Sequence, residues 1–253
     1  MKLYHKSFSD SPTEKYVCPR CKTGALVVEK DSFTFVEPFH SKQEHTDDSW
    51  DPYWIEFRFA FKSRCDRATC GEVSHCSGVG GVDQRYDYEG VPEYFNYFKI
   101  CSFIPAPLLV AVPEKTPPEV MKLISRSFAL YWTDTSAAAN ALRASLESLL
   151  DEMKIPRTQT SAKGGDHRLN LHQRMELWSK QEAENAELCQ VLKEVGNLGS
   201  HGEIVGDKDY IGVLNIYSHV LFQLFDNNAM KMKELAASII ASIKNSKAAQ
   251  YDL

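Results

Sequence analysis

Hydrophobic and polar positions alternate through the first hundred residues. In WIEFRFAFK, residues 54–62, the apolar residues Phe57, Phe59 and Phe61 are separated by polar or small ones. A period of two is typical of a strand with one buried face. YFNYFKICSF, residues 94–103, predicts a second strand by its aromatic content.

The pattern changes in the middle of the chain. GVGGV, residues 78–82, is glycine-rich and predicts a turn. IPAPLLVAVPEKTPPEV, residues 104–120, holds five prolines and predicts an extended connector. After Pro118 the apolar positions follow a helical period almost to the end.

The helical part predicts a bundle with short loops. We expect a first helix in SAAANALRASLESLLDEM, residues 136–153, a second over about 183–201, a third from about Gly212 and a fourth over about 228–244. In the first of these, a polar line lies beside the apolar stripe: Asn140, Arg143 and Glu147. The predicted fold class is therefore α+β, with a β-rich module at 1–103, a connector at 104–118 and an all-α domain at 119–253.

The composition and net charge indicate which class of protein this chain belongs to. A net charge of −5, 43% hydrophobic and 25% charged residues are typical of a soluble globular protein without a general nucleic-acid-binding coat. There is no apolar run of membrane-spanning length and no secretory signal, so we expect a cytoplasmic protein with no membrane partner. In a reducing compartment, paired cysteines favour metal binding over disulfides.

Two cysteine pairs predict that metal site. CPRCKTG supplies Cys18 and Cys21, and CDRATCG supplies Cys65 and Cys70. Four thiolates in two tight turns would hold a tetrahedral structural zinc ion, as in a zinc ribbon with an inserted hairpin. Two alternatives stay open: Cys76 or the preceding His75 replaces one ligand, or the cysteines are unrelated buried thiols.

One local stretch is basic. Residues 154–174 contain five Lys and Arg residues against a single acid, Asp166. Lys163, Arg168 and Arg174 are candidate contacts to a phosphate backbone. A solvated connector without a ligand is the alternative interpretation.

VGNLGSHG, residues 195–202, ends the second predicted helix with three glycines. Asn197 and His201 lie four residues apart, so a continuing helix places them on one face. They either pack at a polar seam against Arg143 and Glu147, or belong to a catalytic centre. The candidate catalytic residues are His201, Asn197 and Arg143, with His201 as the base and an arginine stabilising phosphate oxygens.

A family resemblance rests on these motifs in order. The proline-rich segment, AAANALRASLESLL and VGNLGSHG, following a paired-cysteine module, resemble the bacterial family called domain of unknown function 4145 over residues 103–226. That family is similar to the HEPN superfamily of helical domains. The resemblance implies a homodimer and a role in phage defence or restriction, with RNA, DNA or a larger restriction subunit as partner.

The HEPN signature pairs an arginine with a histidine four to six residues later. His201 and Asn197 match it, but Glu194, Val195 and Gly196 stand where the arginine belongs. The sequence therefore predicts a zinc-binding recognition module for nucleic acid or protein. The alternatives are a metal-independent endoribonuclease using His201, and a recruiting subunit of a larger restriction or helicase complex.

Overall fold

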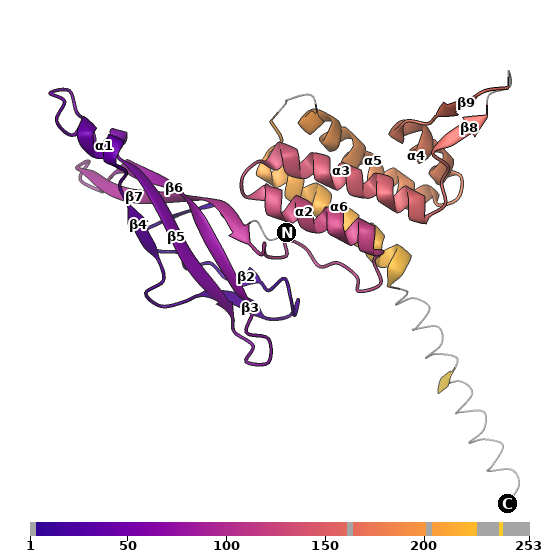
Figure 1. Cartoon of the computed structure of the whole chain (residues 1–253), viewed down its shortest axis with the longest axis horizontal. Coiled ribbons are helices and arrows are strands. Elements are labelled where there is room, and N and C mark those ends of the chain that lie inside the picture. Colours follow the sequence, from indigo (N-terminus) through magenta and orange to yellow (C-terminus); the bar gives the residue numbers. More distant parts are fainter. Residues whose placement is uncertain (1–3, 161–163, 201–203, 227–237, 240–253) are drawn as a thin grey trace, which may run out of the picture.

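The computed structural model describes residues 4–160, 164–200, 204–226 and 238–239. It confirms the α+β prediction, because an antiparallel sheet precedes a group of helices (Figure 1). The strands of the sheet are β1 (Ser7–Ser9), β2 (Tyr16–Val17), β3 (Ala25–Val28), β4 (Thr34–Val36), β5 (Glu56–Cys65), β6 (Val73–Tyr86) and β7 (Pro92–Ile104).

Hydrogen bonding joins the strands in the order β1–β7–β6–β5–β3–β2. Strand β4 pairs with the part of β5 that β3 leaves open. The short helix α1 (Phe39–Glu44) and the 3-10 turn η1 (Pro52–Trp54) fill the connection from β4 to β5. The predicted alternation in β5 is confirmed, since Phe57, Phe59 and Phe61 are buried and their neighbours exposed.

The prediction of a turn at residues 78–82 was wrong, because these residues form the middle of the 14-residue strand β6. The glycines make room for rings from both neighbouring strands. A Cβ on Gly78 would lie 2.7 Å from the Phe59 ring of β5, and one on Gly80 would lie 2.8 Å from the Phe98 ring of β7. Phe59 and Phe98 thus meet across β6, with ring centroids 5.4 Å apart.

Residues 105–117 connect the sheet to the helices without a helix of their own. The helical part contains α2 (Pro118–Tyr131), α3 (Thr135–Glu152), α4 (Leu171–Ser179), α5 (Ala183–Ser200) and α6 (Asp207–Phe225). The predicted helices at 136–153 and 183–201 match α3 and α5 closely. Helix α6 begins five residues before the predicted Gly212, where Asp207 and Asp209 occupy its first turn.

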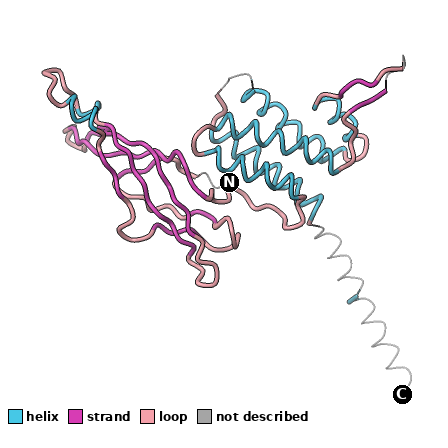
Figure 2. Tube along the Cα trace, viewed as in Figure 1, coloured by secondary structure: helices cyan, strands magenta, loops and turns pink. Residues whose placement is uncertain are grey.

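Within the helical part, strands β8 (Thr158–Thr160) and β9 (Asp166–Arg168) form a short separate hairpin that the sequence did not predict (Figure 2). Helices α2 and α4 were also not predicted as separate helices. The fourth predicted helix, at 228–244, falls almost wholly outside the described residues. None of the helices in the described ranges has the length and apolar composition that crossing a membrane requires.

The sheet and the helices share one buried joint. Trp132 at the end of α2 packs against Phe103 of β7, with ring centroids 4.8 Å apart, and against Tyr16 of β2 at 5.4 Å. Beside these rings, the Lys6 ammonium donates to Thr135 Oγ1 at 2.8 Å and to Asp207 Oδ1 at 2.6 Å. One side chain from the N-terminal segment therefore contacts the first residues of both α3 and α6.

Candidate metal centre and arginine groove

The register of the sheet brings the two cysteine pairs together. Cys18 and Cys21 lie in the turn between β2 and β3, while Cys65 ends β5 and Cys70 follows in the turn to β6. Strand β3 pairs with β5 so that Leu26 lies opposite Cys65, which places both turns at the same end of the sheet. After β4, α1 and η1, strand β5 therefore runs back beside β3 and brings the second cysteine pair to the first.

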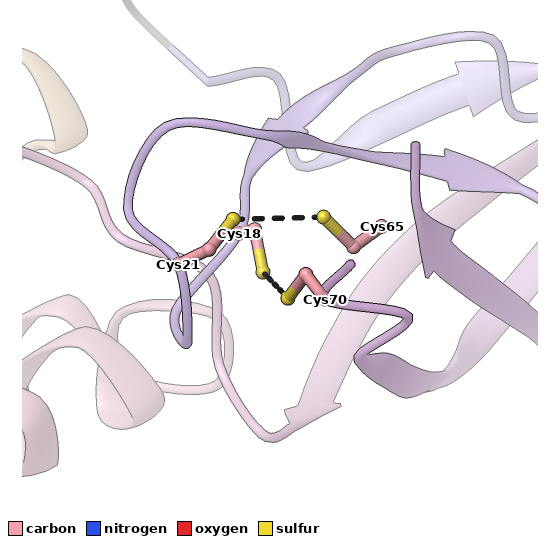
Figure 3. A group of neighbouring side chains, drawn as sticks. All are labelled: Cys18, Cys21, Cys65 and Cys70. Atoms are coloured by element: carbon pink, nitrogen blue, oxygen red, sulfur yellow. Dashed lines mark hydrogen bonds between the residues drawn. The ribbon is translucent and has the colours of Figure 1, made fainter. Parts of the chain in front are cut away.

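The four sulfur atoms form a compact group (Figure 3). All lie within 4.8 Å of one another, with Cys18–Cys70 at 3.8 Å and Cys21–Cys65 at 3.7 Å. A tetrahedral ion with metal–sulfur distances of about 2.3 Å separates its ligands by about 3.8 Å. The sulfur–sulfur distance of a disulfide is only about 2.05 Å. The arrangement therefore fits a metal ion coordinated by four thiolates.

The backbone around the cysteines favours thiolates. The Gly24 N–H donates to Cys21 Sγ at 3.2 Å, and hydrogen bonds from Thr23 and then Gly24 lower the pKa of Cys21 to about 6. Burial has the opposite effect on Cys65, whose pKa it raises to about 12. Because a bound cation would offset that desolvation, the buried thiols gain most from a metal.

Gly24 fixes how closely the two turns approach. A Cβ at this position would lie 2.6 Å from Cys65 Sγ and 2.9 Å from the Arg67 side chain. A side chain on the glycine of CPRCKTG would thus collide with the second turn.

Cys76 and His75 do not belong to this group. Cys76 is buried on the inner face of β6, opposite Phe61 and Phe103, and burial raises its pKa. His75 points to the exposed outer face of the same strand. Cys18, Cys21, Cys65 and Cys70 are the complete cysteine and histidine set at this centre among the residues that the structure describes.

A second candidate site lies in the helical part, where α3, α4 and α5 meet. Two adjoining cavities of about 280 and 320 Å³ share the lining residues Arg143, Asn170 and Leu171. We call this combined depression the arginine groove. Its further polar lining residues are Glu147, Arg157, Arg168, Arg174, His172, Lys193, Glu194 and Asn197.

The candidate catalytic residues Arg143 and Asn197 therefore line one groove. Gly196 allows this, because a Cβ there would lie 2.6 Å from Arg143 Cβ and α5 could not approach α3 as closely. In the predicted polar line, Arg143 and Glu147 form only a long ion pair, with 3.9 Å between the guanidinium and the carboxylate. The third candidate, His201, lies outside the described residues.

Arg174 is buried and held by neighbouring groups. It is 3% exposed and donates to Asp151 Oδ1 at 2.7 Å, to the Ile155 carbonyl at 2.9 Å and to the Glu147 carbonyl at 3.2 Å. These bonds fix α4 against the end of α3. Arg168, in contrast, is exposed at the end of β9, and Lys163 lies outside the described residues.

One groove residue, Lys193, was missed in the sequence, and two others, Arg157 and His172, belonged to the basic stretch 154–174 without being chosen as contacts. Only folding brings all three to the same depression. Asn170 did carry a signal, since Asn170 and Gln173 form a capping box that starts α4. An Asn or Ser followed three residues later by Glu or Gln is a helix-start signature.

Comparisons with known families divide the chain in two. A family profile described as a domain of unknown function (DUF8608) matches residues 6–105, and another described as a domain of unknown function (DUF4145) matches residues 125–245. The second match confirms the resemblance of the helical part, while the zinc-ribbon and HEPN likenesses stay predictions. No curated protein and no solved structure matches the chain.

Proposed function

We propose that the protein is a zinc-stabilised recognition module that binds the phosphate backbone of RNA or DNA in the arginine groove. The observation that carries this proposal is the convergence of Arg143, Arg157, Arg168 and Arg174 on one depression from separate segments of the chain. Phosphate contacts supply most of the affinity of proteins for nucleic acid. A local groove also reconciles such binding with a net charge of −5.

The four arginines divide into two roles. Arg157 and Arg174 share the single carboxylate of Asp151, which holds both side chains in place, so their main role is to shape the groove. Arg143 forms only the long ion pair of 3.9 Å with Glu147, and its side chain is 28% exposed. Arg168 has no ion-pair partner within the described ranges. Arg143 and Arg168 are therefore the proposed phosphate contacts, and Arg174 is a positioning residue.

Binding to labelled single-stranded RNA and DNA tests this proposal. We expect salt-dependent binding of at least one of them by the full chain, followed by fluorescence anisotropy at 50 and 200 mM salt. Arg143→Met and Arg168→Met should each weaken it and reduce the slope of log affinity against log salt by about one. Arg126→Met removes an exposed arginine of α2 outside the groove and should change neither quantity. Absence of salt-dependent binding to both nucleic acids would contradict the proposal.

The metal is proposed to be Zn²⁺ with a structural role. Four thiolates leave no open coordination position, which is the arrangement of structural zinc sites. Without the ion, the two turns at the end of β2, β3 and β5 would lose the link between them. The metal thus stabilises the sheet and is not expected to take part in a reaction.

Elemental analysis of the purified chain should find one zinc ion per molecule. Cys18→Ser should lose the ion and lower the unfolding temperature, because structural zinc binding is coupled to folding. Cys101→Ser is the matched control, since Cys101 lies outside the four-cysteine group and its zinc content should be unchanged. A metal-free wild-type protein that unfolds at the same temperature as Cys18→Ser would refute the zinc assignment.

A metal-independent endoribonuclease is the second candidate. The observation that favours it is the shared position of Arg143 and Asn197, with His201 directly following the last residue of α5. Cleavage of the same RNA without added magnesium, lost in His201→Ala while RNA binding persists, would support it. Binding without cleavage would support the recognition module.

The biological setting is also a proposal. The resemblance of the helical part to HEPN domains favours a cytoplasmic bacterial homodimer acting in phage defence or restriction. Size measurement in solution tests the dimer. An operon shared with restriction or helicase genes would support the setting.

A further inference from the structure

The far end of the sheet carries an exposed group of tyrosines and carboxylates. It comprises Asp51, Tyr53, Asp83, Tyr86 and Tyr94, and we call it the acidic-aromatic tip. The tip lies where β6 ends and β7 begins, at the opposite end of the sheet from helices α2–α6 (Figure 1). It is therefore separate from both the metal centre and the arginine groove.

Local contacts hold these residues together. The Tyr53 hydroxyl donates to Gln84 Oε1 at 2.8 Å, and the rings of Tyr53 and Tyr94 lie 6.2 Å apart edge to face. Partial burial raises the pKa of Tyr53, and the charge of Asp83 nearby raises it further. Asp51 accepts a hydrogen bond from the Tyr53 N–H, which places its carboxylate at the same turn.

The tip is open to solvent although it is rich in aromatic groups. Tyr53, Tyr86 and Tyr94 are 51%, 70% and 49% exposed. Tyr88 and Val91, in the turn between β6 and β7, are exposed as well. Clustered exposed aromatics are a mark of protein interfaces, where tyrosine is enriched.

The charge at this end is strongly negative. Residues 83–93 contain four acidic residues, at positions 83, 87, 89 and 93, against the single cation Arg85. Arg85 is already neutralised by Glu93 at 2.8 Å. A nucleic acid would be repelled here, so the tip requires a cationic partner.

The hairpin itself shows how a cation binds there. The guanidinium of Arg85 lies 5.4 Å from the centroid of the Phe95 ring while it pairs with Glu93. A ring face and a carboxylate thus hold one guanidinium together. On the other face of the hairpin, where Tyr94 lies opposite Gln84, the rings of Tyr53 and Tyr94 and the Asp51 carboxylate at the Tyr53 turn offer the same two components, a ring and a carboxylate.

We propose that the acidic-aromatic tip is a docking surface for an arginine-rich segment of a partner protein. Guanidinium groups stack on tyrosine faces and pair with carboxylates, and arginine does both better than lysine. This surface goes beyond the proposed nucleic-acid binding, because it gives the module a second, protein-directed contact of opposite charge.

A labelled peptide of six Arg-Gly repeats tests the proposal with the full, metal-loaded chain. We expect saturable binding that is weaker for the Lys-Gly peptide and absent for the Glu-Gly peptide. Tyr53→Ala with Tyr94→Ala should weaken binding about fivefold or more, because two cation–π contacts are lost. Tyr53→Phe with Tyr94→Phe keeps both rings and should retain most of the affinity.

Charge variants test whether peptide binding depends on the carboxylates of the tip or only on the overall negative charge of the protein. Asp51→Asn with Asp83→Asn keeps the oxygen acceptors that Tyr53 and Gln84 use, and should weaken binding and its salt dependence. Glu187→Gln removes one exposed carboxylate of α5 and Arg168→Met alters the groove, and neither should change peptide binding. Equal binding by all variants, no saturable binding, or RNA binding that the tip variants abolish would overturn the proposal.

Discussion

At the scale of single residues, Asp151 holds two arginines of the groove in place. Its carboxylate accepts hydrogen bonds from both Arg157 and the buried Arg174. The bonds from Arg157, then from Arg174, hold the pKa of Asp151 below its usual value, although partial burial opposes them. One carboxylate therefore joins the end of α3 to α4 and to the segment that leads into β8.

Asp151→Asn should destabilise the protein by about 1–3 kcal/mol at pH 7, because Arg174 would keep a buried charge without its counter-ion. A carboxyl with a lowered folded-state pKa stabilises the fold above its unfolded value and loses that effect as the pH falls through the folded value. The difference in unfolding temperature between wild type and variant should thus shrink below about pH 4. Thermal unfolding at pH 7, 5 and 3 measures it, with Asp48→Asn, in an exposed loop, as the control. A difference that grows as the pH falls would contradict this role.

At the scale of elements, glycines decide how closely neighbouring segments pack. In α5, Gly196 lies directly beneath the Arg143 side chain, whereas Gly212 of α6 has no atom within 4 Å of the place where a Cβ would stand. Helical glycine costs stability unless a close contact requires it. A side chain therefore fits at position 212 and does not fit at position 196.

Gly196→Ala should destabilise the protein by about 1–3 kcal/mol and weaken nucleic-acid binding, since α5 must move away from α3. Gly212→Ala should stabilise it by about 0.5–1 kcal/mol through helix propensity alone. Denaturant unfolding of the two variants beside wild type checks both signs. Stabilisation by both substitutions would show that the α3–α5 contact is not tight.

The sequence predicted elements with a regular period better than elements set by packing. The strand of Phe57–Phe61 and the helices α3 and α5 follow from periodicity. The glycines of β6 did not, because their reason lies in rings supplied by two other strands. The cysteine group was predicted from local spacing, whereas the groove needed Arg157 and Lys193, which only the fold brings near Arg143.

At the scale of the whole molecule, Lys6 joins the sheet to the helices. Its ammonium lies 4.1 Å from the Tyr131 ring centroid and binds Thr135 and Asp207, while its side chain is only 12% exposed. The Tyr131 hydroxyl in turn donates to the Tyr4 carbonyl at 3.1 Å. The two parts of the chain are therefore joined by buried and partly buried polar contacts as well as by packed rings.

Lys6→Met keeps the apolar stem and removes the charge, so it should loosen this joint by about 1–3 kcal/mol. We expect calorimetry to show two unfolding transitions in place of one, because the sheet and the helices would no longer unfold together. Lys99→Met, on the exposed face of β7, is the control and should keep the wild-type profile. A single transition at an unchanged temperature in Lys6→Met would show that the aromatic packing alone couples the two parts.

The bare middle of β6 has a consequence for how the sheet assembles. A hairpin of β6 and β7 alone would leave the Phe98 ring exposed over glycines, because the rings that cover it come from other strands: Phe59 of β5, Phe35 of β4 and Phe8 of β1. The core around Phe98 is therefore complete only when β1, β4 and β5 have all joined this hairpin. The glycines of β6 leave room that the Phe59 and Phe98 rings of the neighbouring strands occupy.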